Sequence, residues 1–290
     1  MAICWFDQNL VSVRNELMLL KKKFADYELS GRQTLIQPEK EGYRTSFPDD
    51  TIDDFPLTVV LSENGWIRSY RGHSLVANSL KFRDGDGVKF IAELSRSQKL
   101  LFITSKGRSF SLALDQLKKD RGYGEPLNLI IGTESVSSIV SVLPFQKEHK
   151  GLIFSKNGLG FAVDFSSLQS STKVGKQIFE LGEGDEVIGL KEITGDNIIV
   201  LSDSFKMLIF SIKELPLLKK GKGVRLQRYK AEFLLDAMFF SQNEKNDRVI
   251  KKMFPKNEEI GNWMGKRGQV GKMLPKKLLR KKLTKFKDLL

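Results

Sequence analysis

The sequence Leu152-Ile-Phe-Ser-Lys-Asn-Gly-Leu-Gly-Phe-Ala-Val163 joins two apolar runs through a tight turn. Asn-Gly between such runs is the strongest short-range signal of a β-hairpin, since the turn needs residues that tolerate a positive φ angle. The pattern therefore predicts a hairpin. It recurs three more times, as Leu57-Thr-Val-Val-Leu-Ser-Glu-Asn-Gly-Trp-Ile-Arg-Ser-Tyr70, Leu100-Leu-Phe-Ile-Thr-Ser-Lys-Gly-Arg-Ser-Phe-Ser-Leu112 and Ile198-Ile-Val-Leu-Ser-Asp-Ser-Phe-Lys-Met-Leu-Ile-Phe210.

The four hairpins belong to a longer repeat. Their turn positions, Gly65, Gly107, Gly158 and Phe205, lie 42, 51 and 47 residues apart. Three weaker strands, each entered from a glycine turn, precede the later hairpins, in Gly85-Asp-Gly-Val-Lys-Phe-Ile91, Gly132-Thr-Glu-Ser-Val-Ser-Ser-Ile139 and Gly184-Asp-Glu-Val-Ile188. A repeated unit of about four strands cannot bury both faces of its sheet alone, so the copies are predicted to pack as propeller-type blades.

A basic glycine loop follows the second, third and fourth hairpins. Its glycine lies 15, 17 and 16 residues after the turn position. A β-sandwich would also give regular strands, but it gives no reason for a basic loop at a constant offset. The loops are Arg121-Gly122-Tyr123-Gly124, Lys173-Val174-Gly175-Lys176 and Lys219-Lys220-Gly221-Lys222-Gly223.

The segments that flank the repeats differ from them in composition and in the spacing of apolar residues. Leu10, Val13, Leu17, Leu20 and Phe24 recur at threes and fours, which predicts one amphipathic helix. Residues 30–55 are polar and rich in proline, glycine and aspartate, as is typical of a linker. We therefore expect four parts: a helix within residues 1–29, a linker over 30–55, an all-β body over 56–272 and a basic tail over 273–290.

Counting excludes several classes of protein. One cysteine, Cys4, and two histidines, His73 and His149, cannot form a disulfide framework or a three-ligand zinc site. No Gly-x-x-x-x-Gly-Lys-Ser/Thr motif occurs. We expect no cofactor and no metal. Charges interrupt the longest apolar stretches, and the first residues lack the pattern of a signal peptide, so a cytoplasmic, nucleoid-associated protein with no membrane partner is expected.

The net charge of +13 is unevenly distributed. Residues 265–290 hold ten Lys/Arg and one Asp, so most of the excess belongs to the C-terminal tail. In the body, the basic loops could present their cations to DNA phosphates, and recurrence at one repeat position favours this over simple solvation. No recognition-helix, zinc-finger or basic-zipper pattern occurs, so any DNA contact is expected to run through the backbone.

Three motifs, taken in their order along the chain, carry a resemblance to a known family. They are Val59-Val-Leu-Ser-Glu-Asn-Gly-Trp-Ile-Arg-Ser-Tyr-Arg-Gly-His73, Arg121-Gly-Tyr-Gly-Glu-Pro-Leu127 and Leu217-Leu-Lys-Lys-Gly-Lys-Gly223. Over about residues 17–290 the chain resembles the C-terminal part of the A subunit of bacterial DNA topoisomerase IV, which is related to the gyrase A C-terminal β-pinwheel domain. Gly265-Lys-Arg-Gly-Gln-Val-Gly271 falls where that family closes its last blade.

The resemblance implies a fold and a function. The fold is an all-β, propeller-like β-pinwheel of about five blades, the last degenerate around Arg248-Val-Ile-Lys-Lys-Met-Phe254, preceded by the end of the breakage–reunion region. The function is binding of duplex DNA in support of decatenation and relaxation by a type II topoisomerase. The gyrase box, needed for wrapping DNA in gyrase, has no clean counterpart, which favours the topoisomerase IV side.

The resemblance also limits the expected activity. The family's catalytic tyrosine region lies upstream of any matched segment, so the chain alone is predicted to be inactive as an ATP-dependent topoisomerase. In the family the partners are the ATPase B subunit and a second A subunit, and these contacts are not expected from this chain alone. A propeller-like protein-interaction scaffold without a DNA role stays open as an alternative. The candidate DNA-binding residues are Arg71, Arg108, Arg121, Lys173, Lys176, Lys219, Lys220, Lys222, Lys266 and Arg267.

Overall fold

The structure is a computed structural model that describes residues 13–23, 54–73, 80–117, 122–132, 138–170, 172–230, 232–241 and 257–274. The chain divides into two compact units, Met1–Asp50 and Thr51–Leu290. In the first unit a helix covers residues 13–23, with its side chains exposed, where the apolar spacing predicts one. The second unit contains the β-structure and is described by itself below.

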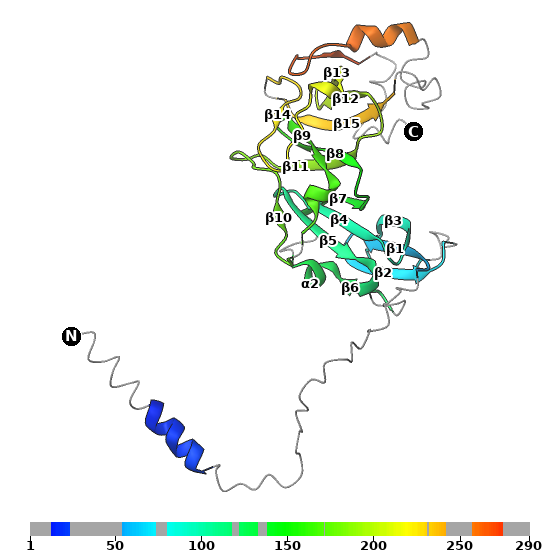
Figure 1. Ribbon diagram of the computed structural model, residues 1–290. Helices are drawn as coiled ribbons and strands as arrows, with labels where there is room; N and C mark the ends of the chain where they lie inside the picture. Colours follow the sequence, from blue (N-terminus) through cyan, green and yellow to red (C-terminus); the bar gives the residue numbers. More distant parts are fainter. Residues whose placement is uncertain are drawn as a thin grey trace, which may run out of the picture. The chain divides into compact units, whose positions relative to one another are not determined.

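Four antiparallel sheets of four strands each make up the described part of the second unit. They follow one another in chain order from the bottom of Figure 1 to its top. Sheet 1 has the strand order β3 (Val88–Ser95), β1 (Pro56–Ser62), β2 (Trp66–Arg71), β6 (Glu125–Pro126). The order in sheet 2 is β10 (Lys176–Gln177), β5 (Arg108–Ala113), β4 (Lys99–Thr104), β7 (Ile139–Pro144), and in sheet 3 it is β11 (Val187–Glu192), β8 (Lys150–Ser155), β9 (Leu159–Asp164), β14 (Val224–Arg225). Sheet 4 has the order β15 (Leu234–Phe240), β12 (Asn197–Ser202), β13 (Lys206–Ser211), β16 (Lys272–Met273).

Short helical turns connect the strands. After the hairpins of sheets 2, 3 and 4 come η2 (Leu114–Gln116), α3 (Phe165–Leu168) and η4 (Ile212–Glu214). The structure describes two more in this unit: α2 (Leu127–Ile131), which follows β6, and η5 (Asn257–Trp263). The prediction of an all-β body preceded by an N-terminal helix is therefore confirmed.

The four predicted hairpins are the centres of the four sheets: β1–β2, β4–β5, β8–β9 and β12–β13. Their turn residues have the expected positive φ, from 74° to 83° for the three glycines and 61° for Phe205. Phe205 is the one non-glycine residue with a positive φ in the part of the chain that the structure describes. The glycine turns thus placed three of the hairpins, and the repeated apolar pattern placed the fourth, whose turn has Phe205 in place of glycine.

Each hairpin is completed by strands that come later in the chain. The weaker strands β3, β7, β11 and β15 pair with the first strand of the hairpin before them, not with the hairpin that follows. The outermost strand comes from further on still, because β6, β10 and β14 follow the hairpin of the next sheet in sequence. Neighbouring sheets are therefore linked by strand exchange, as in a pinwheel.

One glycine per repeat permits this exchange. Gly124, Gly175, Gly223 and Gly271 precede the exchanged strands, and each has a φ between 74° and 94°. A Cβ at Gly124 would lie 2.4 Å from the Ile67 carbonyl oxygen, and one at Gly271 would lie 2.5 Å from that of Met207. Side chains are therefore excluded where the exchanged segment meets the outer edge of the preceding hairpin.

A buried apolar residue follows each of these glycines by three positions. Leu127, Ile178, Leu226 and Leu274 are at most 3% exposed. Their backbone N–H groups donate to the carbonyl oxygens of the hairpin turns, at Gly65, Gly107, Gly158 and Phe205, over 2.8–2.9 Å. The glycine and the apolar residue together fix each exchanged segment along the outer edge of the preceding hairpin.

Apolar side chains fill the spaces between successive sheets. Leu100 and Phe102 of β4 pack toward sheet 1, whereas Leu101 and Ile103 pack toward sheet 3. Both faces of this strand are buried, which explains why it reads as a continuous apolar run. A third cluster joins sheets 3 and 4. No cluster among the described residues joins sheet 1 to sheet 4.

The two ends of the array are covered differently. The outer face of sheet 4 packs against Ile260, Trp263 and Leu274. On sheet 1, Arg68 is 5% exposed, stacks on Phe82 and donates to the Lys81 carbonyl oxygen over 2.7 Å. The degenerate copy around residues 248–254 lies outside the described residues.

We predict that Gly223→Ala destabilises the domain by about 2 kcal/mol or more, because alanine is strained at a φ of 75° and its Cβ would lie 2.7 Å from the Gly160 carbonyl oxygen. Chemical denaturation measures the change in the free energy of unfolding. Gly182→Ala is the control, since no atom lies within 4 Å of a Cβ there. Equal stabilities of the two variants would contradict the role given to Gly223.

Candidate nucleic-acid interface

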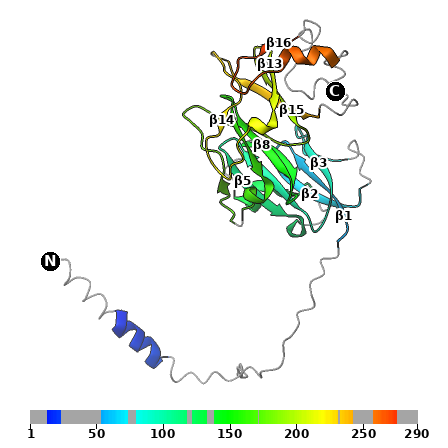
Figure 2. The same ribbon diagram turned by 45° about the horizontal axis from the view of Figure 1, so that its top comes forward.

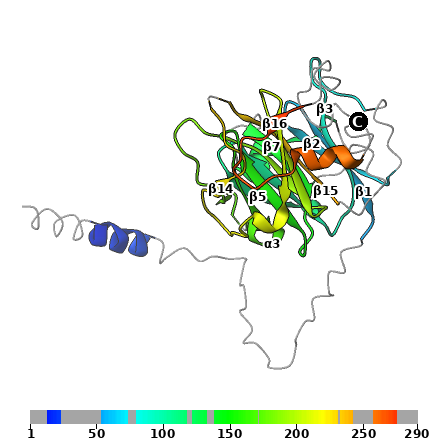
Figure 3. The same ribbon diagram turned by 90° about the horizontal axis from the view of Figure 1, so that it is seen from above.

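The basic loops belong to the exchanged segments on the outside of the sheets. We call residues 122–132, 172–180, 219–230 and 264–274 the outer segments. β14, in the third of them, lies on the opposite side of the domain from β1 in all three views (Figures 1, 2 and 3). Each outer segment carries one close-approach glycine and one exchanged strand, so the repeat places the loops at equivalent positions.

Consecutive outer segments touch one another. The Gly221 N–H donates to the Ile178 carbonyl oxygen over 3.0 Å, and the Glu180 N–H donates to that of Gly221 over 2.9 Å. The next pair repeats this pattern, because the Gly268 N–H donates to Leu226 over 2.9 Å and the Arg228 N–H donates to Gln269 over 3.0 Å. The second, third and fourth outer segments therefore form one continuous surface.

Positive charge accumulates on the last two outer segments. Residues 219–230 and 265–274 hold nine Lys/Arg and no Asp or Glu. In contrast, residues 122–132 carry Glu125 and no cation, and residues 172–180 carry Lys173, Lys176 and Glu180. The positive charge of the candidate interface is thus greatest beside sheets 3 and 4.

The sequence-predicted residues are distributed unequally over this surface. Lys173, Lys219, Lys222 and Lys266 are exposed on outer segments. Lys176 is exposed too, and its Nζ donates to the Ser167 carbonyl oxygen over 2.8 Å. Four of these cations, Lys173, Lys176, Lys219 and Lys222, lie in the repeated loops, and Lys266 lies in the segment where the resembled family closes its last blade.

Four further candidates have other surroundings. Lys220 lies 3.2 Å from the Glu180 carboxylate, which partly neutralises it. Arg108 begins β5 beside the hairpin turn. Arg71 ends β2, at the other end of that strand from the turn, and its guanidinium stacks on Phe55 at 4.6 Å. Arg121 lies outside the described residues.

Arg267 joins two outer segments through its side chain. Its Nε donates to the Glu214 carbonyl oxygen over 3.0 Å, and its NH1 group donates to that of Arg225 over 2.9 Å. Its backbone N–H donates to the Glu214 carboxylate over 2.8 Å. Arg267 therefore contributes both positive charge and a structural link.

Sequence reasoning found Lys266 and Arg267 at this junction but missed four cations around them: Arg225, Arg228, Lys230 and Lys272. The backbone bonds between residues 226–228 and 268–269 bring exposed Arg225, Arg228 and Lys230 beside exposed Lys266 and Lys272. We call these five residues together with Arg267 the basic seam. The acid-free run Lys219–Lys230 was visible in the sequence and could have indicated half of it, whereas the pairing with residues 265–272 could not be read from it.

Other cations near the hairpin turns are paired with acids. Lys156 bonds Glu186 over 3.1 Å, and Lys206 bonds Glu232 over 2.5 Å. The segment Glu180–Glu186 contains four acids and no base. The expected basic circumference is therefore interrupted between sheets 2 and 3.

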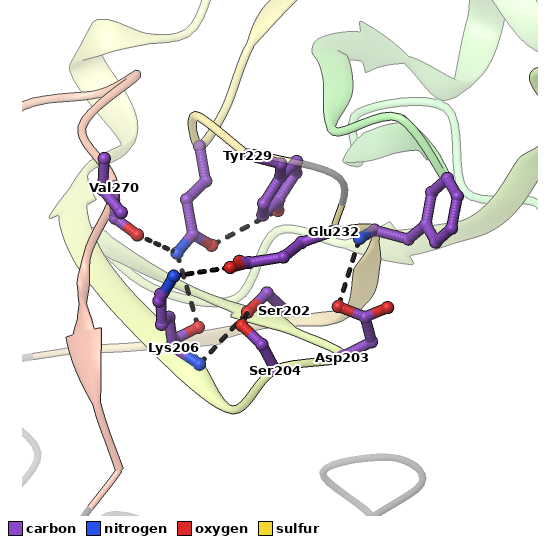
Figure 4. A network of polar contacts seen from close by, with 9 residues as sticks. Ser202, Asp203, Ser204, Lys206, Tyr229, Glu232 and Val270 are labelled. Carbon is purple, nitrogen blue, oxygen red and sulfur yellow. Dashed lines mark hydrogen bonds and ion pairs between the residues drawn. The ribbon is translucent and has the colours of Figure 1, made fainter.

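A polar network stabilises the hairpin turn of sheet 4 (Figure 4). The Lys206 ammonium donates to Glu232, and the Lys206 N–H donates to the Ser202 hydroxyl over 3.1 Å. Buried Gln227 receives a hydrogen bond from Tyr229 and donates to the Val270 carbonyl oxygen over 2.6 Å. The network thus connects both halves of the basic seam to the sheet beneath.

Two groups in this network have shifted pKa values. The hydrogen bond from Lys206 lowers the pKa of the Glu232 carboxyl, since it favours the ionised form. Burial raises the pKa of the Tyr229 phenol, and the nearby Asp203 and Glu232 carboxylates raise it further. Glu232 is therefore charged and Tyr229 neutral at neutral pH.

Comparisons of sequence agree with this architecture. Residues 98–121, 152–193 and 196–240 match the profile of the family described as DNA gyrase C-terminal domain, beta-propeller. The A subunit of DNA topoisomerase 4 from Rickettsia conorii is 33% identical over 278 residues, covering 91% of this chain and 36% of that protein. That of Caulobacter vibrioides is 36% identical over 223 residues, covering 76% and 29%. The chain thus spans about a third of the length of the curated relatives it matches.

Solved structures give the same answer for the fold. The structure of the E. coli ParC C-terminal domain aligns with a TM-score of 0.67 and 26% identity, covering 77% of this chain and 95% of that one. A crystal structure of the C-terminal domain of DNA topoisomerase IV aligns with a TM-score of 0.63 at 13% identity, covering 77% and 73%.

Fold and profile together define the second unit as a β-pinwheel of the gyrase A C-terminal kind. Within that class, the chain is similar to the C-terminal part of the topoisomerase IV A protein, as its motifs predict. Among the described residues, no helix is long and apolar enough to span a membrane.

We predict that Glu232→Gln lowers the melting temperature at neutral pH and that its effect disappears in acid. Because the folded-state pKa of Glu232 is lowered, the charge stabilises the fold above the ordinary value of about 4.3 and ceases to do so as pH falls through the lowered value. Thermal unfolding across acid and neutral pH measures this. Glu186→Gln is the matched control: it neutralises the carboxylate that pairs with Lys156, which is more exposed than that of Glu232, so it should change the melting temperature little at any pH. A constant effect of Glu232→Gln across the range would contradict the assignment.

Proposed function

We propose that the second unit binds duplex DNA through the basic seam and the neighbouring loops, and thereby supports decatenation and relaxation by a type II topoisomerase. The observation that carries the proposal is the concentration of nine Lys/Arg without an acid on two adjoining outer segments. Such a surface attracts the phosphate backbone and releases its counterions. The likeness to the A proteins of topoisomerase IV supports the same function.

The arrangement of the cations favours binding through phosphates. Arg225, Arg228 and Lys272 are exposed and held on strands and hydrogen-bonded turns, so they present fixed charges to a duplex. None of the helices described in the second unit has the length of a recognition helix. We therefore expect tolerance of base sequence and a steep dependence of affinity on salt.

The alternative, a protein-interaction scaffold without a DNA role, predicts outer loops that lack a basic rim. The first outer segment fits that description, but the third and fourth do not. The charge distribution therefore favours DNA.

We predict that reversing Arg225, Arg228 and Lys272 to Glu weakens binding to a mixed-sequence duplex and lowers the slope of log K against log[salt] by about 2–3, at about 0.9 per lost phosphate contact. Fluorescence anisotropy over a salt series measures both quantities. Reversal of Lys219, Lys220 and Lys222 tests the loop in the same way.

A matched control is present in the chain itself. Lys21, Lys22 and Lys23 are three exposed lysines on the helix of the first unit. Their reversal changes the net charge equally and should leave the slope nearly unchanged. If the seam and control variants behave alike, only net charge matters and the proposed interface is wrong.

The tail is predicted to add affinity without being required. Because Leu274 is buried and its N–H bonds Phe205, a truncation that spares the fold removes residues 275–290. This deletes seven Lys/Arg and one Asp. Anisotropy should then show weaker but still salt-dependent binding, whereas complete loss would assign DNA binding to the tail.

A further inference from the structure

One position in the outer segments carries a feature that phosphate binding does not explain. The residue just before each close-approach glycine is Tyr123, Val174, Lys222 or Val270, at intervals of 51, 48 and 48 residues. Tyr123 is 48% exposed, Val174 65% and Val270 40%, and Lys222 is exposed too. We call these four the tip residues.

The backbone holds the tip residues in place. At Val174 the Gly175 N–H donates to the Thr172 carbonyl oxygen over 3.1 Å and closes a tight turn. On the other side of that turn, a Cβ at Gly175 would lie 2.6 Å from the Phe110 ring. The loop is therefore seated against β5, and its tip is left in solvent.

Single exposed apolar residues are ordinary on protein surfaces, but repetition at one structural position is not explained by chance exposure. Lys222 shows that the position accepts a charged side chain. A surface that bound only phosphates would be improved by a cation at every tip. Three of the four repeats instead carry an apolar or aromatic group there.

Cations lie beside the apolar tips. Lys173 and Lys176 flank Val174, and Lys272 follows Val270 by two residues. Beside Tyr123, the Arg83 guanidinium lies 5.4 Å from the ring centroid and 3.8 Å from that of Trp66. The pattern is an apolar tip with positive charge on its flank.

We propose that the apolar tips contact the deoxyribose walls of the minor groove while the flanking cations bind the phosphates on its two sides. This rests on the proposed DNA-binding function and specifies how the duplex is oriented at each outer segment. The C–H edges of the deoxyribose rings are apolar parts of the minor-groove walls, and apolar side chains at the minor groove are a known means of engaging deformable duplex. The domain then prefers DNA that places its minor groove toward successive tips.

The test separates apolar contact from charge. A variant with Tyr123→Ser, Val174→Ser and Val270→Ser changes no charge, and the high exposure of the tips makes a folding defect unexpected. We expect about a tenfold or greater loss of affinity for a mixed-sequence duplex with an unchanged salt slope. Lys222→Ser, at the same repeat position, should instead lower the slope by about 0.9. Melting temperatures confirm that both variants are folded.

A second readout locates the groove. Replacing guanine by inosine removes the 2-amino group from the minor groove and leaves the major-groove pattern and the phosphates unchanged. The unaltered protein should bind the inosine duplex at least about threefold more tightly, and the triple-serine variant should not distinguish the two duplexes.

The outcomes are distinguishable. If the triple-serine variant binds as well as the unaltered protein while Lys222→Ser reduces the slope, the tips do not contact DNA and only the further inference is overturned. An equal response of the unaltered protein to inosine and guanine duplexes overturns the minor-groove placement. If the unaltered protein shows no salt-dependent binding at all, the proposed function itself is wrong.

Discussion

The four sheets are held in one array because sheets 1, 2 and 3 are each closed by a segment that follows the hairpin of the next sheet. A hairpin alone would leave the outer edge of its second strand with unpaired N–H and C=O groups, which must find partners. The exchanged segment supplies them, as when Leu226 donates to the Gly158 carbonyl oxygen. Glycine at position 223 lets the two backbones approach. Stacking of the sheets, position of the loops and placement of the cations all follow from this contact.

Local features of the fold could be predicted from the sequence, and pairing between distant segments could not. Asn64-Gly65 and Asn157-Gly158 specify turns by their own chemistry, so the hairpins were found. The strand Val187–Glu192 precedes one hairpin and pairs with the other. Its apolar residues suit either partner, because both faces of these sheets are buried, and only the packed structure decides between them.

The candidate site shows the same division. Lys219, Lys220 and Lys222 are adjacent in sequence, and their repeat position identified them. The backbone hydrogen bond from Arg228 to Gln269 joins the third and fourth outer segments, and no local sequence pattern predicts it. The acidic partners of individual lysines could not be predicted from the sequence either. Lys206 resembles the other turn lysines in sequence, yet it forms an ion pair with Glu232 and stabilises the fold.

The fourth outer segment has a role that does not depend on DNA. Residues 265–274 provide the outer strand of sheet 4, although no described sheet follows them. Without them, β13 would present a bare strand edge, which is a template for pairing with other chains and for aggregation. During synthesis, that edge stays open until these residues have left the ribosome. The segment thus covers the exposed edge of the last hairpin, β12–β13, which is synthesised some sixty residues earlier, and prevents it from starting an intermolecular sheet.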